Sequence, residues 1–70
     1  MVDDKYILTV KFRITGRIRS ISFDNLTDAE YTYKTFIIYH STYFEWLKIT
    51  WGDTIIHEQI IEKGDNNNGT

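Results

Sequence analysis

The chain has 70 residues, of which 41% are hydrophobic and 26% are charged, and its formal net charge is -2. A chain of this length forms one small domain with one core. It contains no cysteine, which excludes disulfides, thiolate metal sites and thiol nucleophiles. The weak negative charge gives no whole-molecule attraction for nucleic acid or anionic lipid, so any such binding must come from a local patch.

The first residues, MVDDKYILTV, carry acids where a signal peptide carries basic residues. No apolar run approaches the roughly 20 residues that span a bilayer. We therefore predict a cytoplasmic protein, in the host cytoplasm if it is viral, with no membrane partner. Composition and turn signals predict a flexible N-terminus at 1–4, a single domain at 5–62 and a disordered polar tail at 63–70.

The segment KYILTVKFRI, residues 5–14, alternates between apolar and polar side chains, as does a strand with one buried face. Thr15-Gly16 then favours a two-residue turn, because glycine readily adopts a positive φ. The segment RIRSISF returns as the second strand. A two-residue turn would place Val10 opposite Ile21 in the hairpin.

The segment LTDAEY predicts the start of a helix. Thr27 and Glu30 have the spacing of a capping box, and Leu26 with Tyr31 has that of the accompanying hydrophobic staple. We expect the helix to run from about Asp28 to about Thr42. Its buried face, at helical spacing, is expected to carry Ala29, Tyr33, Phe36, His40 and Tyr43.

A second hairpin follows the helix. EWLKITW (45–51) alternates again, Gly52-Asp53 favours a tight turn, and TIIHEQII (54–61) is expected to be the return strand. The resulting fold class is α+β, with the order ββαββ. Two hairpins would form a four-stranded antiparallel sheet, and the single helix would cover one of its faces.

The sheet face turned away from the helix is expected to expose large apolar side chains. Such patches often mark interfaces, so we predict that this face binds a protein partner, either a second copy in a homodimer or a foreign protein. The residues that we assign to it are Ile7, Ile18, Trp46, Ile55 and Ile61. They are interleaved with Lys11, Arg13, Lys48 and His57.

Four of the eight basic residues surround the first turn. This basic tip would contact phosphates or an acidic protein surface. Alternatively, its members are solvated ends of the hairpin whose aliphatic stems cover apolar atoms. The four residues are Lys11, Arg13, Arg17 and Arg19.

No pattern in the chain predicts chemistry. His40 and His57 are the only histidines, and nothing in their spacing suggests a metal or catalytic pair. Capping and the helix dipole account for Asp24, Asp28 and Glu30. We therefore predict a protein that is not an enzyme, with no catalytic residue, no metal and no cofactor.

In its size, composition and expected architecture the chain resembles the small accessory proteins encoded by phages of Gram-positive bacteria. It is very short, free of cysteine, rich in Ile, Tyr and Lys, and expected to place two hairpins about a helix over residues 5–62. That group includes anti-CRISPR and other anti-defence inhibitors and uracil-DNA glycosylase inhibitors. No motif carries the resemblance, so it assigns no residue a role.

The resemblance implies a viral inhibitor or regulator that occupies a surface of a larger host protein or complex. Two alternatives remain open. One is a nucleic-acid-binding protein that inserts a basic hairpin into a groove, led by Arg13, Arg17 and Arg19. The other is an oligomeric protein that binds a small ligand or nucleotide, with Trp46 or Trp51 stacked on a base between subunits.

Overall fold

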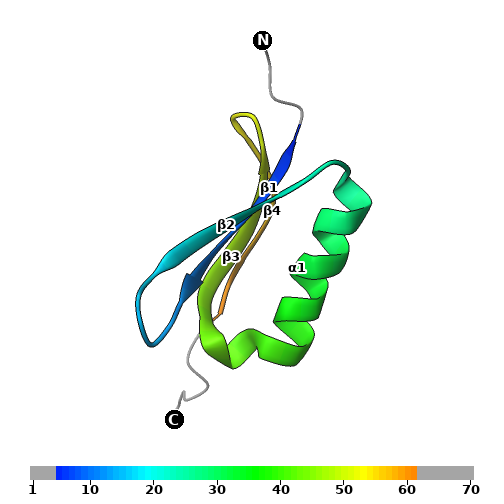
Figure 1. Cartoon of the computed structure of the whole chain (residues 1–70). Coiled ribbons are helices and arrows are strands. Elements are labelled where there is room, and N and C mark those ends of the chain that lie inside the picture. The colour runs from blue at the N-terminus through cyan, green and yellow to red at the C-terminus, as the bar shows by residue number, and fades with distance from the viewer. Residues whose placement is uncertain (1–4, 62–70) are drawn as a thin grey trace.

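The computed structural model describes residues 5–61, which form one sheet and one helix (Figure 1). Four strands join antiparallel in the order β2-β1-β3-β4, and α1 lies across one face of the sheet. The predicted ββαββ layout is confirmed, whereas the predictions for 1–4 and 63–70 lie outside the described residues. The elements are β1 (Tyr6–Phe12), β2 (Ile18–Phe23), α1 (Leu26–His40), a 3-10 helix (Ser41–Tyr43), β3 (Phe44–Trp51) and β4 (Thr54–Ile60).

The core lies between α1 and the two central strands. Alternation along β1 and β3 points one set of aliphatic side chains towards the helix, and each of these is at most 2% exposed. Burying a side chain of this kind contributes about 1.5–3 kcal/mol. The core consists of Leu8, Val10, Ala29, Tyr33, Phe44, Leu47 and Ile49.

The helix begins earlier than the Thr27–Glu30 capping box predicts. The N-cap is Asn25, whose side-chain oxygen accepts a hydrogen bond of 2.9 Å from the backbone N–H of Asp28. Asparagine caps at least as well as threonine, and the earlier start packs Leu26 against the core. The predicted hydrophobic staple is also wrong, since Leu26 lies within the helix and Tyr31 is 73% exposed.

The first hairpin has a longer loop than the predicted two-residue turn. The backbone N–H of Phe12 donates to the Arg17 carbonyl (2.8 Å), and that of Gly16 donates to the Phe12 carbonyl (3.0 Å). Gly16 has a φ of 73°, a conformation that glycine adopts without strain. Val10 consequently pairs with Arg19 instead of Ile21. A shift of two residues leaves each side chain on its predicted face.

The second hairpin turns at Gly52 as predicted, with a φ of 60°, but β4 contains a bulge. Ile49 pairs with His57 while the next residue, Thr50, pairs with Ile55, so Ile56 is an extra residue in β4. One extra residue exchanges the faces of all that follow it. His57 therefore lies on the helix side, contrary to the prediction.

The bulge also changes which isoleucine near the end of β4 reaches the open face. Ile60 pairs with Trp46 and is 65% exposed. Ile61, which alternation assigned to the open face, is half-buried and packs against the core. Ile60 thus takes the place of Ile61 on the open face.

Candidate functional site

The open face of the sheet is divided into three rows by the cross-strand pairing. The middle row is polar, and Thr9 and Ser20 lie within hydrogen-bonding distance there (3.2 Å). This row consists of Ser20, Thr9, Lys48 and Glu58. The row on one side of it is Ser22, Ile7, Thr50 and Ile55, and the row on the other is Ile18, Lys11, Trp46 and Ile60. The open face therefore carries two smaller apolar groups instead of one continuous patch. One group is Ile7 and Ile55, and the larger one is Ile18, Trp46 and Ile60.

Two lysine side chains also lie beside the apolar side chains of the larger group. The Lys48 ammonium lies 5.3 Å from the centre of the Trp46 ring, within the range of a cation–π contact. Lys11 lies between Ile18 and Trp46 and forms an ion pair of 3.8 Å with Glu45. The indole that was expected to anchor a partner is thus half-buried.

Arg13, assigned to the basic tip, forms hydrogen bonds with backbone groups of the same chain. One guanidinium nitrogen donates to the carbonyls of Phe44 and Ile61, each at 2.9 Å. Its backbone N–H donates to the Tyr43 carbonyl at 2.8 Å. The residue joins the end of β1 to the start of β3 and the end of β4.

The other three basic residues do not form one cluster, because Lys11 and Arg19 lie on opposite faces of the sheet. Lys11 lies on the open face, whereas Arg19 pairs with Val10 and so lies on the helix side. Arg17 follows the loop, and its backbone N–H donates to the Thr15 hydroxyl (3.2 Å). Within residues 5–61, no carboxylate forms an ion pair with Arg17 or Arg19.

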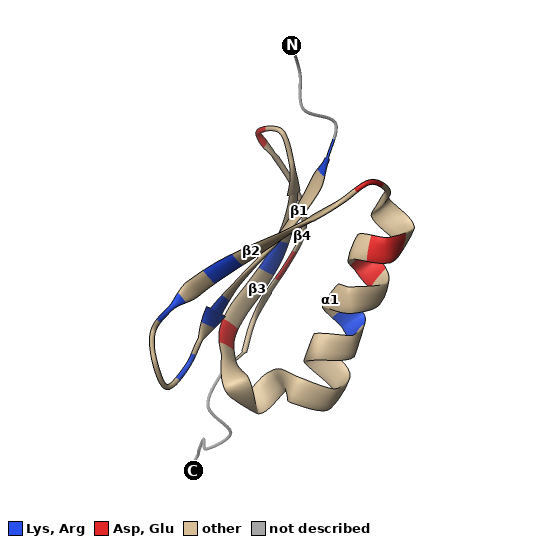
Figure 2. Cartoon of the chain, viewed as in Figure 1, with Lys and Arg blue, Asp and Glu red and all other residues tan. Residues whose placement is uncertain are grey.

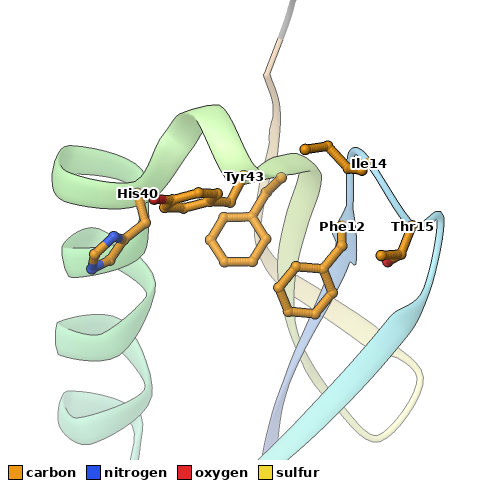
Figure 3. Close-up of a pocket in the computed structure, with 6 residues that line it drawn as sticks. Phe12, Ile14, Thr15, His40 and Tyr43 are labelled. Carbon is orange, nitrogen blue, oxygen red and sulfur yellow. The ribbon is translucent and has the colours of Figure 1, made fainter.

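A cavity of about 320 Å³ opens between the first hairpin and the C-terminal end of α1 (Figure 3). The Phe12 and Phe44 rings lie 5.1 Å apart in its wall. Ile14 is 88% exposed and Tyr43 is 56% exposed, so apolar surface stands open to solvent at its rim. The lining residues are Phe12, Ile14, Thr15, His40, Tyr43 and Phe44.

A second cavity of about 300 Å³ shares Phe12 and Phe44 with the first. Phe36, stacked on Phe44 at 5.2 Å, lines it together with Ile21 and Arg19. We call the two cavities together the aromatic groove. Helical periodicity assigned His40 and Tyr43 to the core, but the helix ends at His40 and leaves both exposed. Nothing in the sequence pattern indicated the groove.

His57 and Glu30 form a pair that sequence spacing did not reveal. Nε2 of His57 lies 2.7 Å from a carboxylate oxygen of Glu30. Because a carboxylate only accepts, this ring nitrogen must carry the proton. The imidazole also stacks on Tyr33 at 5.6 Å, so the pair ties α1 to β4.

The described residues contain no other arrangement that suggests chemistry. No group of three or more potential ligands among His, Cys, Asp and Glu lies close enough in residues 5–61 to hold a metal ion. Burial raises the pKa of Tyr33, and the nearby Glu58 carboxylate raises it further. In the same part of the chain, no helix has the length and apolar character to cross a bilayer.

Comparison with known proteins finds no matching family profile, curated protein or solved structure. The aromatic groove and its charged neighbours are therefore the basis for inferring a function.

Proposed function

We propose that this chain is a non-enzymatic protein-binding module that occupies a surface of a larger protein, as an inhibitor or regulator of the phage type. The aromatic groove would receive an apolar side chain of the partner, and Arg19 would face an acidic residue beside it. The observation that carries the proposal is the cavity itself, whose rim holds Ile14 and Tyr43 exposed to solvent. Exposed apolar walls around a preformed cavity suit a partner's anchoring side chain.

The size of the cavity suits large apolar side chains of a partner. Its volume of about 320 Å³ lies at the lower end of the range for small-molecule sites, which is about 300–1,000 Å³. A cavity of about 150 Å³ holds a benzene ring, so this one has room for about two such side chains. The contacts between Phe12, Phe44 and Phe36 hold the walls in place, which lowers the entropic cost of binding.

Charge supports an acidic partner. Arg19 lines the second cavity and has no carboxylate partner in the described part of the chain. An opposite charge on the partner would speed association and fix its orientation more than it would raise the affinity.

Nucleic-acid binding is the second candidate, because aromatic rings beside arginines can stack bases and meet phosphates. Two observations count against nucleic-acid binding. Arg13 is engaged by backbone carbonyls, and the groove offers few hydrogen-bonding groups to a base. Binding to phosphates would weaken steeply with added salt, with a slope set by the number of contacts.

A nucleotide held between subunits would need a free indole face, and both indoles already contact other side chains, although Trp51 is 41% exposed. Trp51 stacks on Tyr6 with ring centres 6.0 Å apart, and Lys48 covers Trp46. This candidate is accordingly the weakest of the three.

Two matched variants test which surface binds. Ile14→Asp introduces a charge at the rim of the groove, whereas Ile55→Asp introduces it on the open face; both isoleucines are exposed. The tagged wild-type chain is used to capture partners from lysate of the source cell, or of its host if viral, with and without nuclease. We expect a protein whose capture survives nuclease, is lost with Ile14→Asp and is retained with Ile55→Asp.

The opposite pattern, with loss only for Ile55→Asp, would move the binding surface to the open face. Capture that disappears after nuclease treatment would favour nucleic acid. Circular dichroism of both variants confirms that each remains folded.

A further inference from the structure

Strand β2 forms an edge of the sheet with little protection. Among the described residues it pairs only with β1, and nearly all of its residues are exposed. It contains no Pro and no bulge against β1, two of the devices that prevent edge pairing, and its single charged residue, Arg19, lies on the helix side. The opposite edge, β4, carries both a bulge and Glu58.

The outward hydrogen-bonding groups of β2 follow from its pairing. Because the Phe12 N–H donates to the Arg17 carbonyl, bonded pairs recur at every second residue along the ladder. Arg19 and Ile21 therefore bond to β1. Ile18, Ser20 and Ser22 direct their backbone N–H and C=O groups away from the sheet.

The two ends of β2 carry opposite charge (Figure 2). Arg17 immediately precedes the strand and has no carboxylate partner in residues 5–61. Asp24 immediately follows it, is highly exposed and contacts Lys5. A strand that is basic at one end and acidic at the other complements an antiparallel copy of itself.

We propose that β2 pairs antiparallel with β2 of a second copy of this chain, about a two-fold axis at Ser20. In this register Ser20 lies opposite Ser20 and Ile18 lies opposite Ser22, so the outward N–H and C=O groups of all three residues are bonded. The basic end of each strand, at Arg17, then lies at the same end of the contact as the acidic end of the other, at Asp24. The result is a continuous eight-stranded sheet from two four-stranded ones.

This register keeps both helices on the same side of the sheet, because residues of equal parity face each other. The cavity at Ile14 and Tyr43 lies at the hairpin tip and stays open, whereas the second cavity of the aromatic groove is lined by β2 residues, including Arg19 and Ser20, and borders the dimer contact. The first test measures the mass of the full chain in solution over a range of concentrations. We expect the mass to rise with concentration to twice the 8.4 kDa of the monomer.

Substitutions at Ser20 test the backbone pairing. Ser20→Pro removes an outward N–H, which an edge strand tolerates, and should hold the mass at 8.4 kDa. Ser20→Ala keeps the N–H and should still dimerise. Circular dichroism and the urea midpoint show whether the proline variant is folded. A wild-type chain that stays monomeric up to millimolar concentration would overturn the proposal.

A charge exchange tests the antiparallel orientation without relying on proline. Arg17→Glu alone and Asp24→Lys alone each place like charges together and should lower the dimer fraction. An equimolar mixture of the two variants should recover it, since the heterodimer restores opposite charges at both ends. A dimer unaffected by Ser20→Pro and by the charge changes would overturn pairing through β2. A monomer that loses capture of a foreign protein with Ser20→Pro but keeps it with Ile14→Asp would assign the edge to that protein.

Discussion

The guanidinium of Arg13 donates to the carbonyls of Phe44 and Ile61, so a residue at the tip of one hairpin fixes the ends of two other strands. The acceptors lie 31 and 48 positions away in sequence. Alternation and charge clustering could place Arg13 beside the turn, but no local pattern contains its acceptors. The composition of the basic tip was therefore predictable, and the separate roles of its members were not.

Asn25 provides a test of the helix N-cap at the level of a single residue. Asn25→Ala removes the side-chain acceptor for the Asp28 N–H and should lower the free energy of unfolding by about 1 kcal/mol. Thr27→Ala, an exposed position inside the first turn, should change it by less than about 0.5 kcal/mol. Urea unfolding of both variants gives the comparison. A larger loss at Thr27 would restore the capping box predicted from the sequence.

At the scale of elements, the kinds of element and their order were readable from the sequence, whereas the exact pairing of strands was not. Alternation identified β1 and β3, and the capping-box spacing of Thr27 and Glu30 indicated a helix in this part of the chain, although its N-cap is Asn25. The hairpin loop after Phe12 and the bulge at Ile56 depend on how the strands meet α1 and each other. These tertiary contacts determine which isoleucine of β4 reaches the open face.

The bulge predicts different costs at two adjacent residues. Ile61→Ala removes half-buried contacts with the core and should cost about 1–2 kcal/mol, less than the 2–5 kcal/mol of a fully buried site. Ile60→Ala, at a position 65% exposed, should cost less than about 0.5 kcal/mol. Denaturant midpoints measure both. Equal costs, or a larger cost at Ile60, would contradict the register of β4.

For the whole molecule, titratable groups set how stability depends on pH. The pKa of Tyr33 is raised by burial and by Glu58, whereas its unfolded value is near 10.0. In alkaline solution the unfolded chain thus releases this proton first. Its contribution to stability is complete below the unfolded pKa and is lost as the pH rises through the folded pKa.

Tyr33→Phe should therefore flatten the loss of stability above pH 10, while Tyr39→Phe, at a position 73% exposed, should not. Urea midpoints measured across the alkaline range distinguish the two variants.

On the acid side, the contact with Lys5 lowers the pKa of the exposed Asp24. The stability from this contact is present at neutral pH and is lost as the pH falls through the folded pKa.

The polar row of Ser20, Thr9, Lys48 and Glu58 crosses the whole width of the sheet. Two such sheets laid face to face would have to strip water from a lysine and a glutamate at the middle of the contact. Stacking into layers is thereby disfavoured, and at high concentration this chain should associate edge to edge in preference to face to face.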